Sequence, residues 1–196
     1  MTIAASLRLA LASSLAALLP LGAAPVALRA QAASAVGVEA PAAPTTVIIV
    51  RHAEKAAAPA GDPALSAAGQ VRARAIRDLL AAERVDAVVV TQFRRSRETA
   101  APLATARGIT PEVVPTGRDV GAHARAVADH VLKRHAGRTV LVVGHSNTIQ
   151  AIASALGGGP AAEIDESEYD HVVVVVRPAA GESRRLELRV GVPAGS

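Results

Sequence analysis

The pair Arg51-His52 is the part of this sequence whose residue types point most directly to chemistry. A neutral histidine can attack phosphorus as a nucleophile, and a neighbouring arginine can hold phosphate oxygens through its fork of N–H donors. The pair follows the apolar run Thr46–Val50, which predicts a buried parallel strand. Open α/β sheets bind ligands at the carboxyl ends of their strands, so the pair falls where a phosphate site would form.

Two later segments place similar residues at the ends of other predicted strands. The apolar run Ala87–Val90 precedes the segment Thr91–Ala104, which contains Arg95. The run Val140–Val143 precedes Gly144 and His145. Because the carboxyl ends of parallel strands meet at one edge of a sheet, these side chains are expected near His52.

Taken in this order, the motifs resemble those of the histidine phosphatase superfamily, branch 1, whose members are phosphoglycerate-mutase-like. The resemblance covers roughly residues 45 to 177. Arg51-His52-Ala53 matches the family's arginine-histidine-glycine tripeptide, Arg95 matches its second arginine, and His145 its second histidine. Ala53 in place of glycine predicts a backbone that does not need positive φ there.

The resemblance implies that His52 is the nucleophile of a phosphohistidine mechanism and that Arg51, Arg95 and His145 bind the substrate phosphate. Nearby cations disfavour the imidazolium and so keep His52 in the neutral form that attack requires. No metal and no cofactor are implied. The alternatives are a packed histidine and arginines in surface ion pairs, an interpretation that suits the flanking Arg94 and Arg97 better.

The sequence leaves the proton donor for the leaving group open. Asp119 is the carboxylate in the segment after the third predicted strand, and it could equally serve as N-cap of the next helix. Glu54 is the other candidate by proximity, although the resemblance makes it a pocket-wall residue. Without a donor, substrates with good leaving groups would be preferred.

Other chemical residues have ordinary interpretations. His123, His130 and His135 lie on or beside one predicted helix, and a metal site there would need a further ligand, so surface or packed histidines are expected. The acidic stretch Asp165–Asp170 could bind a cation, but a solvated loop is the default interpretation. Ser146, Asn147 and Thr148 are expected to cap the helix after His145.

The first 32 residues have the layout of a secretory signal peptide, with Arg8, an uncharged run over residues 9–28 and small residues after it. We expect export to the periplasm or outside the cell and no stable membrane association after cleavage; the rival interpretation is an uncleaved anchor. Residues 33–44 are expected to be a linker, and residues 45–192 the histidine phosphatase domain.

Composition excludes several classes of function. The chain has no cysteine, which excludes disulfides, thiol nucleophiles and thiolate zinc sites. Its formal net charge of +4 includes Arg8 and Arg29 of the leader, so the mature chain is close to neutral. Phe93 and Tyr169 are its only aromatic residues, which argues against a nucleic-acid partner.

The periodicity predicts a three-layer α/β/α sandwich with a mostly parallel sheet and an antiparallel C-terminal edge strand. Arginines and glutamate alternate with Leu186, Leu188 and Val190, which predicts that this edge strand is half-buried. Predicted strands and helices alternate over Thr46–Val50, Ser66–Ala82, Ala87–Val90, Arg94–Arg107, Glu112–Val114, Ala122–His135, Thr139–Val143 and Thr148–Leu156.

These observations lead to one functional prediction: a metal-independent phosphatase that acts on a phosphorylated small molecule or protein side chain through His52. The alternative is a non-catalytic phosphate-binding or interaction module of the same fold. A phosphoglycerate-type mutase is disfavoured, because the family's mutases are longer and carry insertions that close over a sugar phosphate, whereas the links here are short.

Overall fold

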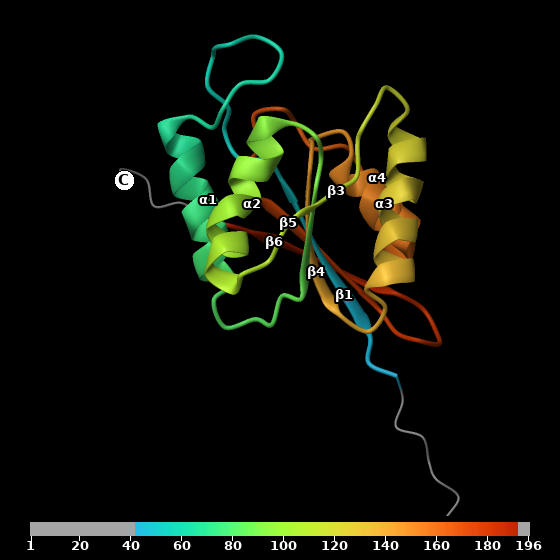
Figure 1. Cartoon of the computed structure of the whole chain (residues 1–196). Helices are drawn as coiled ribbons and strands as arrows, with labels where there is room; N and C mark the ends of the chain where they lie inside the picture. Colours follow the sequence, from blue (N-terminus) through green and yellow to red (C-terminus); the bar gives the residue numbers. More distant parts are fainter. Residues whose placement is uncertain (1–41, 192–196) are drawn as a thin grey trace, which may run out of the picture. The chain divides into compact units, whose positions relative to one another are not determined.

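The computed structural model describes residues 42–191, which form a mixed six-stranded sheet in the order β3-β2-β4-β1-β5-β6 (Figure 1). Strands β1, β2, β3 and β4 run parallel, whereas β5 pairs antiparallel with β1 and β6 antiparallel with β5. The strands span Thr45–Arg51 (β1), Ala87–Val90 (β2), Glu112–Val113 (β3), Thr139–Gly144 (β4), His171–Arg177 (β5) and Arg184–Arg189 (β6).

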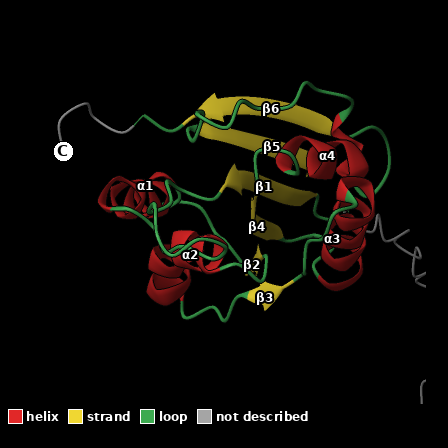
Figure 2. Cartoon of the chain, turned by 90° about the horizontal axis from the view of Figure 1, so that it is seen from above, coloured by secondary structure: helices red, strands yellow, loops and turns green. Residues whose placement is uncertain are grey.

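Helices cover both faces of the sheet. Figure 2 shows α1 and α2 on one side of the strands and α3 and α4 on the other. This is the predicted α/β/α architecture. The helices span Ala67–Leu79 (α1), Arg94–Arg107 (α2), Val120–Arg134 (α3) and Ile149–Ala153 (α4), and a π-helical turn η1 (Ser154–Gly158) follows α4.

Alternation along the central strand explains why two separate cores form. Successive side chains of a strand point to opposite faces, so Val47 and Ile49 pack under α3 and α4, while Ile48 and Val50 pack under α1 and α2. The central strands are therefore apolar on both faces. Such a sheet leaves its polar residues to the strand ends, where the candidate site residues lie.

Local sequence signals set most of the helix boundaries. Ser66 caps α1, its hydroxyl accepting a hydrogen bond from the Gly69 amide at 3.1 Å. Gly108 ends α2 in the left-handed conformation, with φ 64°. The expected helix over Thr148–Leu156 differs in detail, because α4 is short and continues into η1.

The C-terminal edge strand is present, but the prediction that it is half-buried is wrong. Leu186 and Leu188 of β6 are 55% and 43% exposed, and only Val190 beyond the strand is buried. The reason is position: β6 is the outermost strand, and it lies past the helices that cover the sheet centre (Figure 2).

The expected signal peptide, residues 1–32, lies outside the described residues, as does the expected linker apart from its last three positions. Within residues 42–191, no helix has the length and apolar composition needed to cross a membrane. The expected domain boundaries and export therefore stay predictions.

Candidate active site

The register between β1 and β4 brings the two predicted histidines together. Arg51 pairs with Gly144, so the next residue on each strand is a histidine. The His52 amide donates to the Gly144 carbonyl at 2.9 Å, which continues the ladder one step past the strands. The imidazole rings of His52 and His145 meet edge to face, with centroids 5.1 Å apart.

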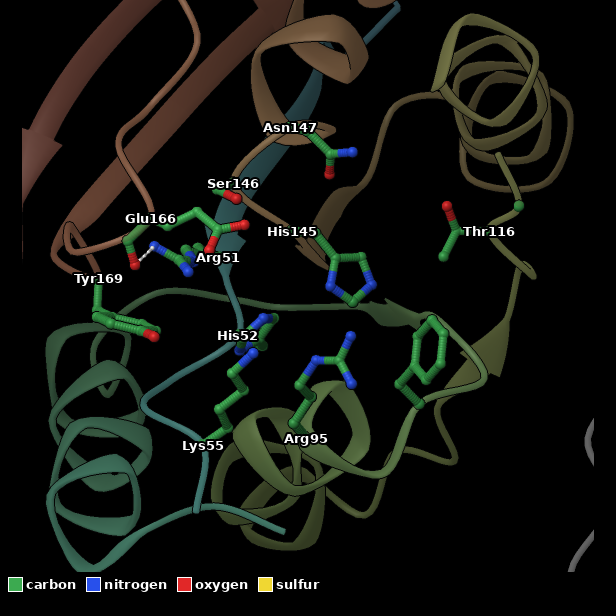
Figure 3. Close-up of a pocket in the computed structure, with 12 residues that line it drawn as sticks. Arg51, His52, Lys55, Arg95, Thr116, His145, Ser146, Asn147, Glu166 and Tyr169 are labelled. Atoms are coloured by element: carbon green, nitrogen blue, oxygen red, sulfur yellow. Dashed lines mark hydrogen bonds between the residues drawn. The ribbon is translucent and has the colours of Figure 1, made fainter. Parts of the chain in front are cut away.

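A cavity of about 300 Å³ opens over this histidine pair at the carboxyl ends of the parallel strands. Figure 3 shows Arg51, Arg95 and Lys55 grouped around His52, with His145 beside them. Both aromatic residues of the chain, Phe93 and Tyr169, also line it. The remaining lining residues are Thr116, Gly117, Ser146, Asn147 and Glu166.

Arg51 is buried and holds one wall of the cavity in place. A single guanidinium nitrogen, Nη1, donates to the backbone carbonyls of Asp165, Glu166 and Glu168 at 3.1, 2.7 and 2.8 Å. Its guanidinium carbon also lies 3.9 Å from the ring centroid of Tyr169. Nε of Arg51 is buried with no hydrogen-bond partner among residues 42–191.

Arg95 reaches the cavity from the first turn of α2. Its guanidinium stacks on the Phe93 ring at 4.3 Å, and Phe93 in turn contacts the His145 ring edge to face at 5.5 Å. Asp62 approaches Arg95 only to 4.0 Å. Nε of Arg95 is likewise buried without a partner in the described part of the chain. Arg51 and Arg95 thus offer unpaired donors to a bound oxyanion.

The hydrogen bond of His52 fixes which of its nitrogens is free. Nδ1 lies 2.8 Å from the carbonyl oxygen of Ala53, and a carbonyl can only accept, so Nδ1 carries the hydrogen. The pKa of His52 is lowered to about 4, chiefly by burial; the Ala53 bond opposes this, and the charges of Arg95, Arg51 and Lys55 act in the same direction as burial. At neutral pH the ring is uncharged, with its lone pair on Nε2.

His145 is held by two threonines. Its Nε2 shares a hydrogen bond of 3.1 Å with the hydroxyl of Thr91, which follows β2. Burial, followed by His52 and Arg95, lowers the pKa of His145 to about 3. The expected capping role of Thr148 is wrong: its hydroxyl makes no cap bond and instead accepts from the His145 amide at 2.8 Å.

The model of the histidine phosphatase superfamily, branch 1, matches this sequence over residues 47–116 and 110–189. The chain belongs to the histidine phosphatase superfamily. No curated protein matches it.

Solved structures agree with the fold of this superfamily member. A candidate phosphohistidine phosphatase, SixA, from Nakamurella multipartitia is 25% identical, with a TM-score of 0.55, covering 78% of this chain and all of that one. The protein histidine phosphatase SixA in complex with tungstate is 18% identical, with a TM-score of 0.57 over 74% of this chain and 96% of its own.

A third similar structure is a mycobacterial glucosyl-3-phosphoglycerate phosphatase, solved with a vanadium oxide, which is 16% identical with a TM-score of 0.59. It covers 74% of this chain and 99% of its own. Together with the superfamily match, these neighbours support phosphatase activity in general.

Neither candidate proton donor is among the residues that line the cavity. Asp119 is exposed and caps α3, where its carboxylate accepts from the Ala122 amide at 2.8 Å. Glu54 forms an ion pair with Arg72 at 2.6 Å, and its backbone carbonyl accepts from the Ser66 amide. Both carboxylates have structural partners, which corrects the expected placement of Glu54 on the pocket wall.

The expectation that the acidic segment is a solvated loop is wrong in part. Although Asp165 is exposed and Glu168 is half-buried, the backbone of this segment folds onto Arg51 and carries Glu166 and Tyr169 to the cavity. The sequence contains one signal for this, the placement of its only tyrosine within an acidic run. Lys55 also lines the cavity and was not among the predicted site residues, although it follows His52 by three residues.

Proposed function

We propose that this chain hydrolyses a phosphate monoester or a phosphorylated side chain through a phosphohistidine on His52. One observation carries the proposal: the β1–β4 register brings His52 against His145, and both line one cavity with Arg51 and Arg95. The cationic side chains balance the charge on the transferring phosphoryl oxygens, as phosphoryl-transfer sites require. This charge balance is why the reaction is proposed to need no metal.

In the first step Nε2 of His52 attacks phosphorus, and the bond from phosphorus to the leaving oxygen breaks. Nδ1 keeps its hydrogen and donates it in a hydrogen bond to the Ala53 carbonyl, which stabilises the positive charge that develops on the ring. The leaving oxygen takes a proton. In the second step water attacks the phosphohistidine, the P–N bond breaks, and inorganic phosphate leaves.

Glu166 is proposed as the group that gives this proton and later takes one from the attacking water. It is the one carboxylate among the described residues that line the cavity, and Figure 3 shows its side chain beside Arg51. A proton donor has to lie within reach of the leaving oxygen, a condition that the capping Asp119 does not meet in this conformation.

The substrate class follows from what lines the cavity. Cationic and hydrogen-bonding side chains dominate it, and Tyr169 and Phe93 supply flat walls beside the phosphate position. A flat phosphorylated group such as a phosphohistidine ring or an aryl phosphate would fit between them. The similarity to the SixA proteins supports a phosphorylated side chain as substrate.

The proposal is tested with an aryl phosphate and excess chelator, comparing the wild type with His52→Ala. Turnover should survive chelation and fall by about 10⁴-fold or more in the variant, because a nucleophile is lost. Quenching the wild type in alkaline denaturant, in which the P–N bond survives, should trap a phosphoryl group on His52. Phosphate binding without turnover on any phosphorylated compound would instead support the non-catalytic module.

The role of Glu166 is tested with two leaving groups. Glu166→Gln should lose at least about 10²-fold on an alkyl phosphate, whose leaving oxygen needs a proton, and far less on an aryl phosphate. Glu163→Gln, an exposed neighbour in the same segment, is the matched control. Equal losses on both esters would assign Glu166 to binding instead of proton transfer.

Export is proposed from the uncharged run at residues 9–28. N-terminal sequencing of the protein from a cell fractionation tests it. A mature chain that begins near residue 33 and lies outside the cytoplasm would support cleavage, and an intact N-terminus in the membrane fraction would support the anchor.

A further inference from the structure

A second group of histidines lies away from the catalytic cavity, beside the edge strand β3. His130 is on α3, His135 is the residue that caps its C-terminus, and Glu112 is on β3. One nitrogen or oxygen from each lies within 4.8 Å of the others. None of the three lines the catalytic cavity.

The two imidazoles converge on one carboxylate. His130 Nε2 lies 2.6 Å from one oxygen of Glu112, and His135 Nε2 lies 2.9 Å from the other. The spacing of five residues would place these histidines on different sides of a continuous helix. They meet because His135 leaves the helix, with φ −132° and ψ 26°.

The surroundings of His135 are a second observation that points to a ligand at this cluster. Only 7% of this residue is exposed, and neither of its ring nitrogens has a properly aligned hydrogen bond among residues 42–191. A buried imidazole whose nitrogens make no well-aligned hydrogen bond is costly. Nε2 nevertheless lies 2.9 Å from a Glu112 oxygen, and a cation between them would satisfy both groups.

We propose that Glu112, His130 and His135 bind a divalent transition metal, with zinc as the reference ion. Two imidazoles and a carboxylate are a known zinc ligand set, and three protein ligands leave a fourth position for water. Tetrahedral ligands about 2.0–2.1 Å from the metal are about 3.4 Å apart, so the N–O distance to whichever Glu112 oxygen binds has to widen by under about 1 Å. The site is separate from the proposed catalysis.

Arg134 is the competing group. Its Nε lies 3.1 Å from the same Glu112 oxygen that faces His130. The side chain is 63% exposed, so it can turn into solvent when a metal displaces it. Removing this cation should therefore strengthen metal binding.

The position of the site indicates a structural role. Strand β3 has only two residues, and the metal would tie it to the C-terminal end of α3. The chain between these elements carries Thr116 and Gly117, which line the catalytic cavity. Zinc should therefore stabilise the fold while leaving the nucleophile untouched.

The test is titration of the chelator-stripped full chain with zinc chloride by calorimetry at neutral pH in excess magnesium. One equivalent of zinc should bind the wild type. Glu112→Gln and His130→Gln should each weaken binding at least about tenfold, a typical minimum for disturbing a metal site. Asp129→Asn, which removes a neighbouring exposed carboxylate, should bind like the wild type, and Arg134→Ala more tightly.

His52→Gln separates this site from the catalytic histidines. Zinc binding that persists in His52→Gln and is weakened in His130→Gln supports the proposal. The reverse pattern would place the metal in the catalytic cavity and overturn it, as would a wild type that binds no zinc. A zinc-dependent rise of the melting temperature, absent from His130→Gln, provides a readout that does not depend on activity.

Discussion

His52 with His145 and His130 with His135 are two histidine pairs in opposite electrostatic surroundings. The first pair lies among Arg51, Arg95 and Lys55 and is suited to an anion. The second converges on the carboxylate of Glu112 and is suited to a cation. The same side chain can thus serve phosphoryl transfer or metal binding, and its neighbours from other elements decide which.

Among the residues that surround the two pairs, the largest effect is expected from removing Arg95, a cation beside the first pair. Arg95→Ala should lower kcat/KM for an aryl phosphate by about 10²–10³-fold, the loss typical of one oxyanion donor. Arg94→Ala is the matched control, because Arg94 lies next to Arg95 but pairs with Glu98 on the helix surface. An unchanged rate in Arg95→Ala would separate Arg95 from the phosphate.

The buried pair should also make stability depend on pH. The pKa of His52 is lowered from 6.5 to about 4 and that of His145 to about 3, chiefly by burial, so between pH 6.5 and 4 the unfolded chain takes up protons that the folded chain does not. The free energy of unfolding should therefore fall as pH drops through this window, by about 3 kcal/mol for His52. Denaturant titrations over this pH range, on the wild type and the double variant His52→Gln/His145→Gln, measure the free energy of unfolding. An equal dependence on pH in both proteins would show that these two histidines are not its source.

Opposite ligands should distinguish the two pairs. Tungstate, which a similar phosphatase binds, should stabilise this chain by about 2.7 kcal/mol at a hundredfold excess over its Kd. The stabilisation by tungstate should be lost in Arg95→Ala and retained in Glu112→Gln. The stabilisation by zinc should be lost in Glu112→Gln and retained in Arg95→Ala. Thermal unfolding of the two variants with each ligand gives the answer, and one variant that loses both gains would break the comparison.

The smallest effect concerns Asp119, which serves neither pair. Asp119→Ala should cost about 1 kcal/mol of stability through loss of a helix cap, with kcat unchanged. Asp119→Asn, which can still cap, should recover most of that stability. A large fall in kcat for both variants, in the folded protein, would return Asp119 to the chemistry.

Much of the fold follows from local pattern. The apolar runs at Thr46–Val50 and Ala87–Val90 predict their strands closely, and the helix Arg94–Arg107 is predicted to the residue. Strand ends then locate Arg51, His52 and His145, because those residues adjoin their strands. The exposed face of β6 was mispredicted, because alternation shows which side chains share a face but not whether anything covers it.

By itself the sequence determined the succession of strands and helices along the chain and the placement of His52 and His145 at strand ends. Both depend on residues that are adjacent in the chain. Tertiary structure alone decided that Arg51 draws Glu166 to the cavity and that Glu112 meets His130 and His135. These contacts join elements far apart in sequence. Their distances are set by sheet register and helix packing, which no local pattern encodes.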